Sequence, residues 1–171
     1  MGFSAKLSYD VFQTEMGWIA IVGADHGIVR ASLPESSPEA ALELVRPEIA
    51  ESLHDPEQLR FARVLLSKYC AGESVDLSEV PIDTRDVSTF FRKAWEACRS
   101  IPFGETRSYQ WLAERAGNSR AARGAGQAMA RNKLALLVPC HRVIASSGAL
   151  GGFGGAGLSL KSKLICLEAN R

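Results

Sequence analysis

The sequence has none of the long apolar runs of a membrane protein, because no stretch approaches the ~18 residues that a membrane-spanning helix needs. Residues 1–6 contain no apolar core of the kind found in a secretory signal peptide. We therefore expect the protein in the cytoplasm, or in the nucleus if its source is eukaryotic, with no membrane partner.

Cysteine and histidine are few, with four cysteines and three histidines in 171 residues. The cysteines are far apart and form no C-x-x-C pair, which argues against a disulfide framework. Only Cys140 and His141 are close neighbours, and adjacent residues do not provide the ligand spacing of a structural zinc site. His26 and His54 stand alone, and we expect them at the surface. We predict no metal.

The glycine-rich segment Gly152–Gly157 matches the G-x-G-x-x-G pattern of dinucleotide-binding proteins. That pattern normally opens a βαβ unit of ~30 residues with an acidic residue ~20 positions further on, and too few residues follow here. We interpret the glycines as a loop that lets the backbone approach a ligand closely. We therefore predict no cofactor.

Charge is divided unequally along a chain whose net charge is only +1. Residues 1–83 carry 6 Lys/Arg and 14 Asp/Glu, a net of −8, whereas residues 84–171 carry 14 Lys/Arg and 5 Asp/Glu, a net of +9. This asymmetry favours a second half that binds a polyanion and a first half that does not. Mutual attraction of the two halves is the alternative, and both can hold.

Residues 1–83 are predicted to contain both strands and helices, as in an α/β domain. Strand-like runs cover residues 6–12, 18–22 and 28–33, and the Asp-His-Gly at 25–27 is typical of a hairpin turn. Helices are predicted over 39–51 and from Pro56 to the glycine at 72.

The second half is predicted to be mostly helical. Ser88 or Thr89 caps one helix and Ser108 caps a short helix to Ala116. A further helix is predicted over 119–131, and two short helices joined by a glycine-containing turn are typical of a helix-turn-helix. A last helix is predicted over 158–168.

The helix predicted over 119–131 consists almost entirely of small residues and arginines. Each glycine in a helix costs ~1 kcal/mol relative to alanine, so Gly124 and Gly126 need a reason. Close approach to a DNA groove is one reason, with the arginines on phosphates or in the base stack. Tight packing against another helix is the other.

The segment 139–143, Pro-Cys-His-Arg-Val, follows the apolar run Leu134–Val138, which is typical of a buried strand. Proline ends regular structure there. The thiol of Cys140 and the potential base His141 therefore come directly after the predicted strand. Cys140 is either a nucleophile or an inert core cysteine. Glu168 is the only acid after Cys140; it either orients His141 or is a surface carboxylate.

These motifs, in this order, resemble those of the O6-alkylguanine-DNA alkyltransferases, also called methylated-DNA–protein-cysteine methyltransferases. The resemblance covers about residues 84–171 and rests on these segments: Ser108-Tyr109-Gln110, Ala121-Ala122-Arg123, Asn132, the pentapeptide 139–143, the glycine loop, and Lys161, Leu164 and Glu168.

The resemblance implies an α/β (α+β) fold in two domains. A small ribonuclease-H-like domain would span residues 1–78, and residues 79–87 would form a linker. A mostly helical domain with a helix-turn-helix would span residues 88–171 and carry the DNA-binding and alkyltransferase functions. Members bind duplex DNA through the minor groove, flip out the guanine and move its O6-alkyl group irreversibly to a cysteine. A monomer acting on double-stranded DNA that contains O6-alkylguanine is therefore expected.

Carried over by motif position, Cys140 is the alkyl acceptor, and His141 deprotonates it through a water. Glu168 supports His141, and Asn132 braces the turn between the recognition helix and the active-site segment. Tyr109 assists flipping and hydrogen-bonds the base.

The resemblance also implies that Arg123 fills the gap in the base stack. The other implied DNA contacts are Tyr109, Arg120, Ala121, Ala122, Ala125 and Gly126. The implied substrate pocket is formed by Tyr109, Met129, Val143, Gly151, Phe153 and Gly154.

The glycine loop departs from the family pattern. Phe153 stands where many members carry tyrosine, Gly154 where some carry serine, and Ala156 is an additional residue. A non-catalytic sensor of damage is one competing hypothesis, which the presence of Cys140 argues against. A Cys-His hydrolase is another, and it predicts turnover and no need for a basic helix-turn-helix.

Overall fold

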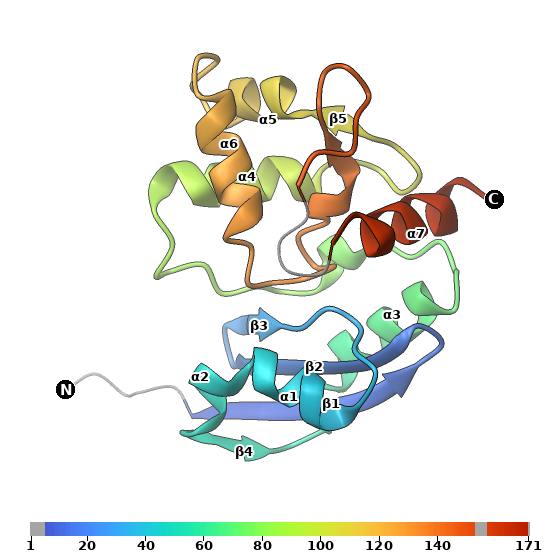
Figure 1. Cartoon of the computed structure of the whole chain (residues 1–171). Coiled ribbons are helices and arrows are strands. Elements are labelled where there is room, and N and C mark those ends of the chain that lie inside the picture. The colour runs from blue at the N-terminus through green and yellow to red at the C-terminus, as the bar shows by residue number, and fades with distance from the viewer. Residues whose placement is uncertain (1–5, 153–156, 171) are drawn as a thin grey trace. The chain divides into compact units, whose positions relative to one another are not determined.

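The computed structural model describes residues 6–152 and 157–170 and shows a mixed α/β protein (Figure 1). The chain forms two compact units, of residues 1–84 with 133–137 and of residues 85–132 with 138–171. The predicted α/β fold class is confirmed.

The first unit contains a four-stranded sheet. Its strands are β1 (Leu7–Thr14), β2 (Gly17–Ala24), β3 (Gly27–Ala31) and β4 (Ser52–His54), in the order β3-β2-β1-β4. β1, β2 and β3 are antiparallel neighbours, and β4 runs parallel to β1. We did not predict β4, because three residues are too few to show the period-2 pattern of a strand.

Helices α1 (Pro38–Leu44) and α2 (Arg46–Ile49) replace the single helix that we predicted over 39–51. Ser37 caps α1 by accepting a hydrogen bond from the backbone N–H of Ala40 at 3.1 Å. Pro47 accounts for the break, because a proline ring inside a helix clashes with the preceding turn and removes a backbone donor.

Helix α3 (Arg60–Cys70) begins four residues after the predicted start at Pro56. Residues 56–59 form turns instead, and a hydrogen bond of 3.2 Å joins the N–H of Arg60 to the carbonyl of Glu57. The glycine at 72 follows the helix with a φ of 82°, a conformation that glycine adopts without a steric cost.

The apolar run from Leu134 is buried as predicted, but its pairing is shorter than a regular strand. The N–H of Ala31 donates to the carbonyl of Lys133 at 2.9 Å, and the N–H of Ala135 donates to the carbonyl of Ala31 at 3.2 Å. Leu136 has a φ of 65°, which L-residues rarely adopt, so the ladder cannot continue through it. Residues 133–137 therefore join the edge of the first unit's sheet at β3.

The second unit is mostly helical. Its elements are α4 (Thr89–Arg99), α5 (Tyr109–Arg115), α6 (Ala122–Ala130), α7 (Gly157–Ala169), the short parallel pair β5 (Arg107–Ser108) and β6 (Val143–Ile144), and the 3-10 turn η2 (Cys140–Arg142). The predicted caps are present, because Ser88 accepts from the N–H of Phe91 at 3.5 Å and Ser108 from that of Trp111 at 3.1 Å.

The two helices of the predicted helix-turn-helix, α5 and α6, pack against each other and against α4. Trp95 of α4 is buried, and its indole N–H donates to the carbonyl of Ala128 in α6 at 2.9 Å. α6 begins three residues later than predicted, since Asn118 accepts from the N–H of Arg120 at 3.1 Å and holds the chain in a turn. None of the helices in the described ranges has the length and apolarity to cross a membrane.

Candidate active site

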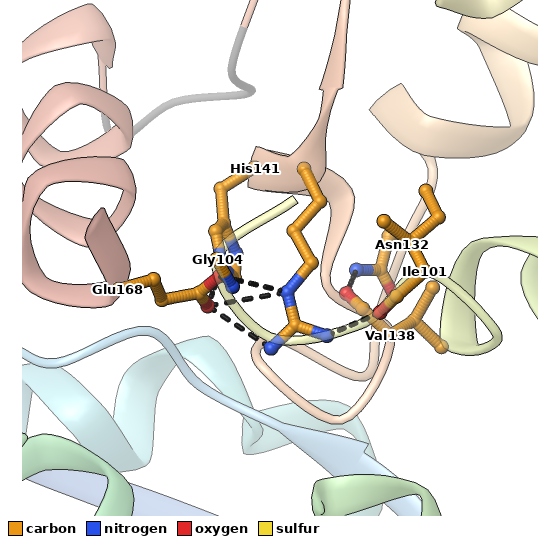
Figure 2. Close-up of polar contacts among 7 residues, drawn as sticks. Ile101, Gly104, Asn132, Val138, His141 and Glu168 are labelled. Carbon is orange, nitrogen blue, oxygen red and sulfur yellow. Dashed lines mark hydrogen bonds and ion pairs between the residues drawn. The ribbon is translucent and has the colours of Figure 1, made fainter. Parts of the chain in front are cut away.

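Cys140 lies in the 3-10 turn η2 and not at the end of a strand. Its N–H donates to the carbonyl of Val138 at 2.8 Å, which tightens the chain directly after Pro139. The Asn132 side-chain amide donates to the same carbonyl at 2.9 Å (Figure 2). It also donates to the Cys140 Sγ at 3.4 Å. Asn132 thus connects the end of α6 to the thiol-bearing turn.

Burial raises the pKa of the Cys140 thiol, although the hydrogen bond from Asn132 and the charge of Lys161 oppose that shift. The thiol is therefore protonated at neutral pH. Because only the thiolate is a strong nucleophile, this cysteine needs a base to take its proton when it reacts.

His141 is the adjacent candidate base, and it is fully buried with 1% exposure. Its Nε2 lies 2.6 Å from the Oε1 of Glu168, which is buried on α7 (Figure 2). Burial lowers the pKa of His141 and outweighs the raising effect of Glu168. The imidazole is therefore neutral at pH 7 and able to accept a proton.

The Glu168 carboxylate accepts further hydrogen bonds from two groups that the sequence did not reveal. Arg142 Nε donates to Oε2 at 3.0 Å and to Oε1 at 3.2 Å, and its Nη2 donates to Oε1 at 3.0 Å. The backbone N–H of Gly104 donates to Oε2 at 3.0 Å. An acceptor of this many N–H groups is ionised, so we infer that the proton of neutral His141 sits on Nε2 and that Nδ1 is the basic nitrogen.

A second group of predicted residues surrounds Tyr109 at the start of α5. Its hydroxyl would lie 3.1 Å from a Cβ placed at Gly151, whose φ is 70°. Lys161, fully buried on α7, donates from Nζ to the carbonyl of Val143 at 2.7 Å and lies 5.8 Å from the centre of the Tyr109 ring. The structure thus brings Tyr109, Gly151 and Val143 together around Lys161, whose role the sequence left open.

The three remaining residues of the predicted pocket are Met129, Phe153 and Gly154. Met129 is buried in α6, with 7% exposure. Phe153 and Gly154 lie outside the residues that the structure describes.

The predicted DNA-contacting helix presents some of its residues to solvent and buries others. Arg120 and Arg123 are exposed, and Ala121, Ala122 and Gly126 are partly exposed. Ala125 is a correction, because its side chain is fully buried and cannot reach a groove. It lies on the core-facing side of α6 with Ala128 and Met129, where their helical spacing places all three.

Packing accounts for one of the two glycines of α6. A Cβ at Gly124 would lie 3.3 Å from Cε1 of Phe90 on α4, a close contact between helices. A Cβ at Gly126 would meet Tyr109 Cδ1 only at 4.0 Å, so this glycine is not explained by packing alone. Across residues 6–152 and 157–170, no three His, Cys, Asp or Glu side chains are grouped so that they could hold a metal ion.

Comparisons with known proteins agree with this geometry. The profile of the family described as "6-O-methylguanine DNA methyltransferase, DNA binding domain" matches residues 89–170. A methylated-DNA–protein-cysteine methyltransferase of Mycolicibacterium paratuberculosis is 35% identical over 95% of this chain and 92% of its own length.

Solved structures from Mycobacterium tuberculosis have the same fold. An O6-methylguanine methyltransferase superimposes with a TM-score of 0.78 at 34% identity, covering 96% of this chain and 94% of that one. A second structure, of OGT in complex with DNA, superimposes with a TM-score of 0.76 at 33% identity, covering 95% of this chain and 92% of that one.

Proposed function

The chain belongs to the methylated-DNA–protein-cysteine methyltransferase family, and from this membership we propose that it repairs DNA by moving the O6-alkyl group of guanine to Cys140. The observation that carries the assignment is the neutral, buried His141, anchored through Nε2 to Glu168 and adjacent in sequence to a protonated thiol. Such a pair supplies the base that a buried cysteine requires.

The proposed transfer is a single displacement at the alkyl carbon. The Cys140 thiol gives its proton to His141 through a bridging water, and the sulfur forms a bond to the alkyl carbon. The bond from that carbon to O6 breaks, and its electron pair stays with the guanine, which takes up one proton. The products are unmodified guanine and a thioether on Cys140. In this proposal the thioether is not removed again, so each molecule acts once.

Asn132 and Tyr109 have supporting roles in this proposal. Asn132 holds the turn that carries Cys140 and donates to its Sγ, which favours the thiolate as it forms. Tyr109 lies against Gly151, where its hydroxyl can hydrogen-bond a bound base. Val143, Met129 and Gly151 complete the proposed pocket.

The proposed partner is duplex DNA that contains O6-alkylguanine, bound by a monomer. A base cannot react at O6 inside the stack, so the guanine must be flipped out. Arg123, which is exposed on a helix of mostly small residues, is the side chain that we propose to fill the vacated space. Arg120, Ala121, Ala122 and Gly126 are the proposed groove contacts, and the net charge of +9 on residues 84–171 supports binding to phosphates.

The test is transfer of a labelled methyl group from O6-methylguanine duplex DNA to the protein. We expect Cys140→Ala to abolish transfer but to bind the same DNA, since the proposed DNA contacts lie elsewhere. Cys166→Ala is the matched control, because Cys166 is exposed on α7, and it should transfer like the wild type. Labelling of Cys140→Ala would refute the assignment, and repeated turnover would indicate a Cys-His hydrolase.

A further inference from the structure

Arg142 is a buried cation that the proposed transfer does not use. The residue is 7% exposed, and its side chain makes three N–H contacts with the Glu168 carboxylate. Its Nη1 donates to the carbonyl of Ile101 at 2.7 Å, and its guanidinium lies 5.8 Å from the centre of the Phe103 ring. The two hydrogen-bonding partners of the guanidinium, Glu168 and Ile101, are labelled in Figure 2. The guanidinium is therefore held on three sides.

We propose that Arg142 is a positioning residue of the transfer, which keeps Glu168 ionised and thereby keeps the Nδ1 of His141 unprotonated at neutral pH, as a base for the thiol must be. This inference rests on the proposed function, because it assigns a role within that reaction. Arg142 acts through Glu168 and does not itself contact the thiol or the base in this account.

The argument begins with the His141–Glu168 pair in the absence of the arginine. Burial favours the neutral form of a carboxyl group, and two strongly coupled groups titrate as a pair. A buried pair without a cation would therefore hold an additional proton at neutral pH, either on the carboxyl or on the imidazole. If the carboxyl is protonated it donates to Nε2, and the proton of the neutral ring moves to Nδ1. If the imidazole is protonated, both nitrogens carry protons.

In either form Nδ1 is occupied, and His141 cannot take the proton of Cys140. The positive charge of Arg142, in hydrogen-bond contact with both carboxylate oxygens, disfavours that additional proton. It also fixes the plane of the carboxylate, because the Nε and Nη2 of the planar guanidinium each donate to one carboxylate oxygen. The Gly104 N–H, from a different segment, donates to Oε2 of the same carboxylate at 3.0 Å.

Other charged or titratable groups near the pair do not replace Arg142 in this role. Lys161 on α7 also lowers the pKa of His141, but less than Arg142 does, and its Nζ is bonded to the carbonyl of Val143. Cys140 on η2 and Cys98 on α4 are thiols whose pKa values burial raises, so both are neutral at pH 7. From the segment 101–104, the contacts are the Ile101 carbonyl, the Phe103 ring and the Gly104 N–H.

The test compares Arg142→Gln with Arg142→Lys in the full chain. The measurement is the rate of Cys140 alkylation by the free base O6-benzylguanine between pH 5.5 and 9, which needs no DNA. In the wild type, the rate should fall only below about pH 6.5, the ordinary pKa of histidine. In Arg142→Gln, the acid limb should move up by about one pH unit or more. At pH values below both limbs its rate should therefore be about tenfold lower than that of the wild type, and the difference should disappear at high pH.

Arg142→Lys keeps the charge and should keep the acid limb near that of the wild type, even if its rate is lower. Arg92→Gln is the matched control, since Arg92 lies at the start of α4, and it should leave the profile unchanged. A rate lowered by the same factor at every pH in Arg142→Gln would mean that Arg142 only supports the fold, and would overturn the proposal.

A second measurement on the wild type does not depend on whether Arg142→Gln folds. The nitrogen shifts of His141, one of only three histidines, report its tautomer in the absence of substrate. The proposal requires a proton on Nε2 and none on Nδ1 at pH 7; an Nδ1–H tautomer or an imidazolium would overturn it. If the wild type shows the required tautomer but does not react with the alkylated base or DNA, the proposed function fails and the role of Arg142 in ionising Glu168 stands.

Discussion

The loss of stability expected on replacing Glu168 by glutamine can be worked out from the contacts of its carboxylate. Glu168 is 4% exposed, and its carboxylate accepts hydrogen bonds from His141, from Arg142 and from the Gly104 N–H. Glutamine has nearly the same size, but it has one acceptor oxygen and a donor group where the second oxygen was. The substitution therefore leaves the Arg142 cation buried without its counter-charge.

Removing one member of a buried ion pair costs about 3–5 kcal/mol. The Ile101 carbonyl still accepts from Arg142 in the variant, so we expect the lower end of this range, about 3 kcal/mol. For a domain of this size, 1 kcal/mol shifts the melting temperature by roughly 2–4 °C. Glu168→Gln should therefore melt roughly 6–12 °C below the wild type.

The assay is urea unfolding followed by circular dichroism, together with a thermal melt. Glu96→Gln is the matched control, because Glu96 is exposed on α4, and it should change the free energy of unfolding by less than about 0.5 kcal/mol. A loss below about 1 kcal/mol in Glu168→Gln would refute the account of an ionised, buried carboxylate that the His141 argument requires.

Three other predictions concern DNA, the base pocket and the backbone. Arg123→Ala should slow repair of O6-methylguanine in duplex DNA but barely change the reaction with a free alkylated base, whereas Tyr109→Phe should slow both; equal slowing by Arg123→Ala would place Arg123 in the pocket or the fold. DNA affinity should fall as the salt concentration rises. If Arg120 contacts one phosphate, Arg120→Ala should reduce the magnitude of the slope of log affinity against log salt concentration by about 0.9. An unchanged slope would mean that Arg120 is not part of the interface. Gly104→Ala should lower the free energy of unfolding in urea by more than about 1 kcal/mol, because Gly104 has a φ of 80° and a Cβ there would lie 3.2 Å from the Glu168 carbonyl oxygen; a stability equal to the wild type would contradict this.

Features encoded by local patterns were predictable from the sequence. Ser88 and Ser108 cap the helices that we expected, because a cap depends on residues three positions away. The neighbouring placement of Cys140 and His141, and the return of Glu168 on the last helix, followed from the ordered motifs, and the structure places Glu168 against His141.

Features that depend on non-local contacts were not predictable. β4 pairs with β1 across more than forty residues and has only three residues of its own. Ala125 was expected at a groove, but the direction in which a small residue of α6 points depends on where α4 and α5 pack. Arg142 was visible in the pentapeptide, but its contacts with Glu168 and Ile101 join segments that are 26 and 41 positions away.

The ionisation state of the thiol was not predictable from the sequence either, because it depends on burial, and burial raises the pKa of Cys140. The hydrogen bond from Asn132 and the charge of Lys161 only reduce this effect. The site thus holds a protonated thiol and, at the next position in the chain, a neutral imidazole.

The most direct test of the central claim is the intact-protein mass after incubation with duplex DNA that contains O6-methylguanine. The account predicts a permanent gain of one methyl group per protein molecule, located on Cys140 by peptide mapping and absent from Cys140→Ala. An unchanged mass, or a methyl group on Cys166 or Cys98, would contradict it.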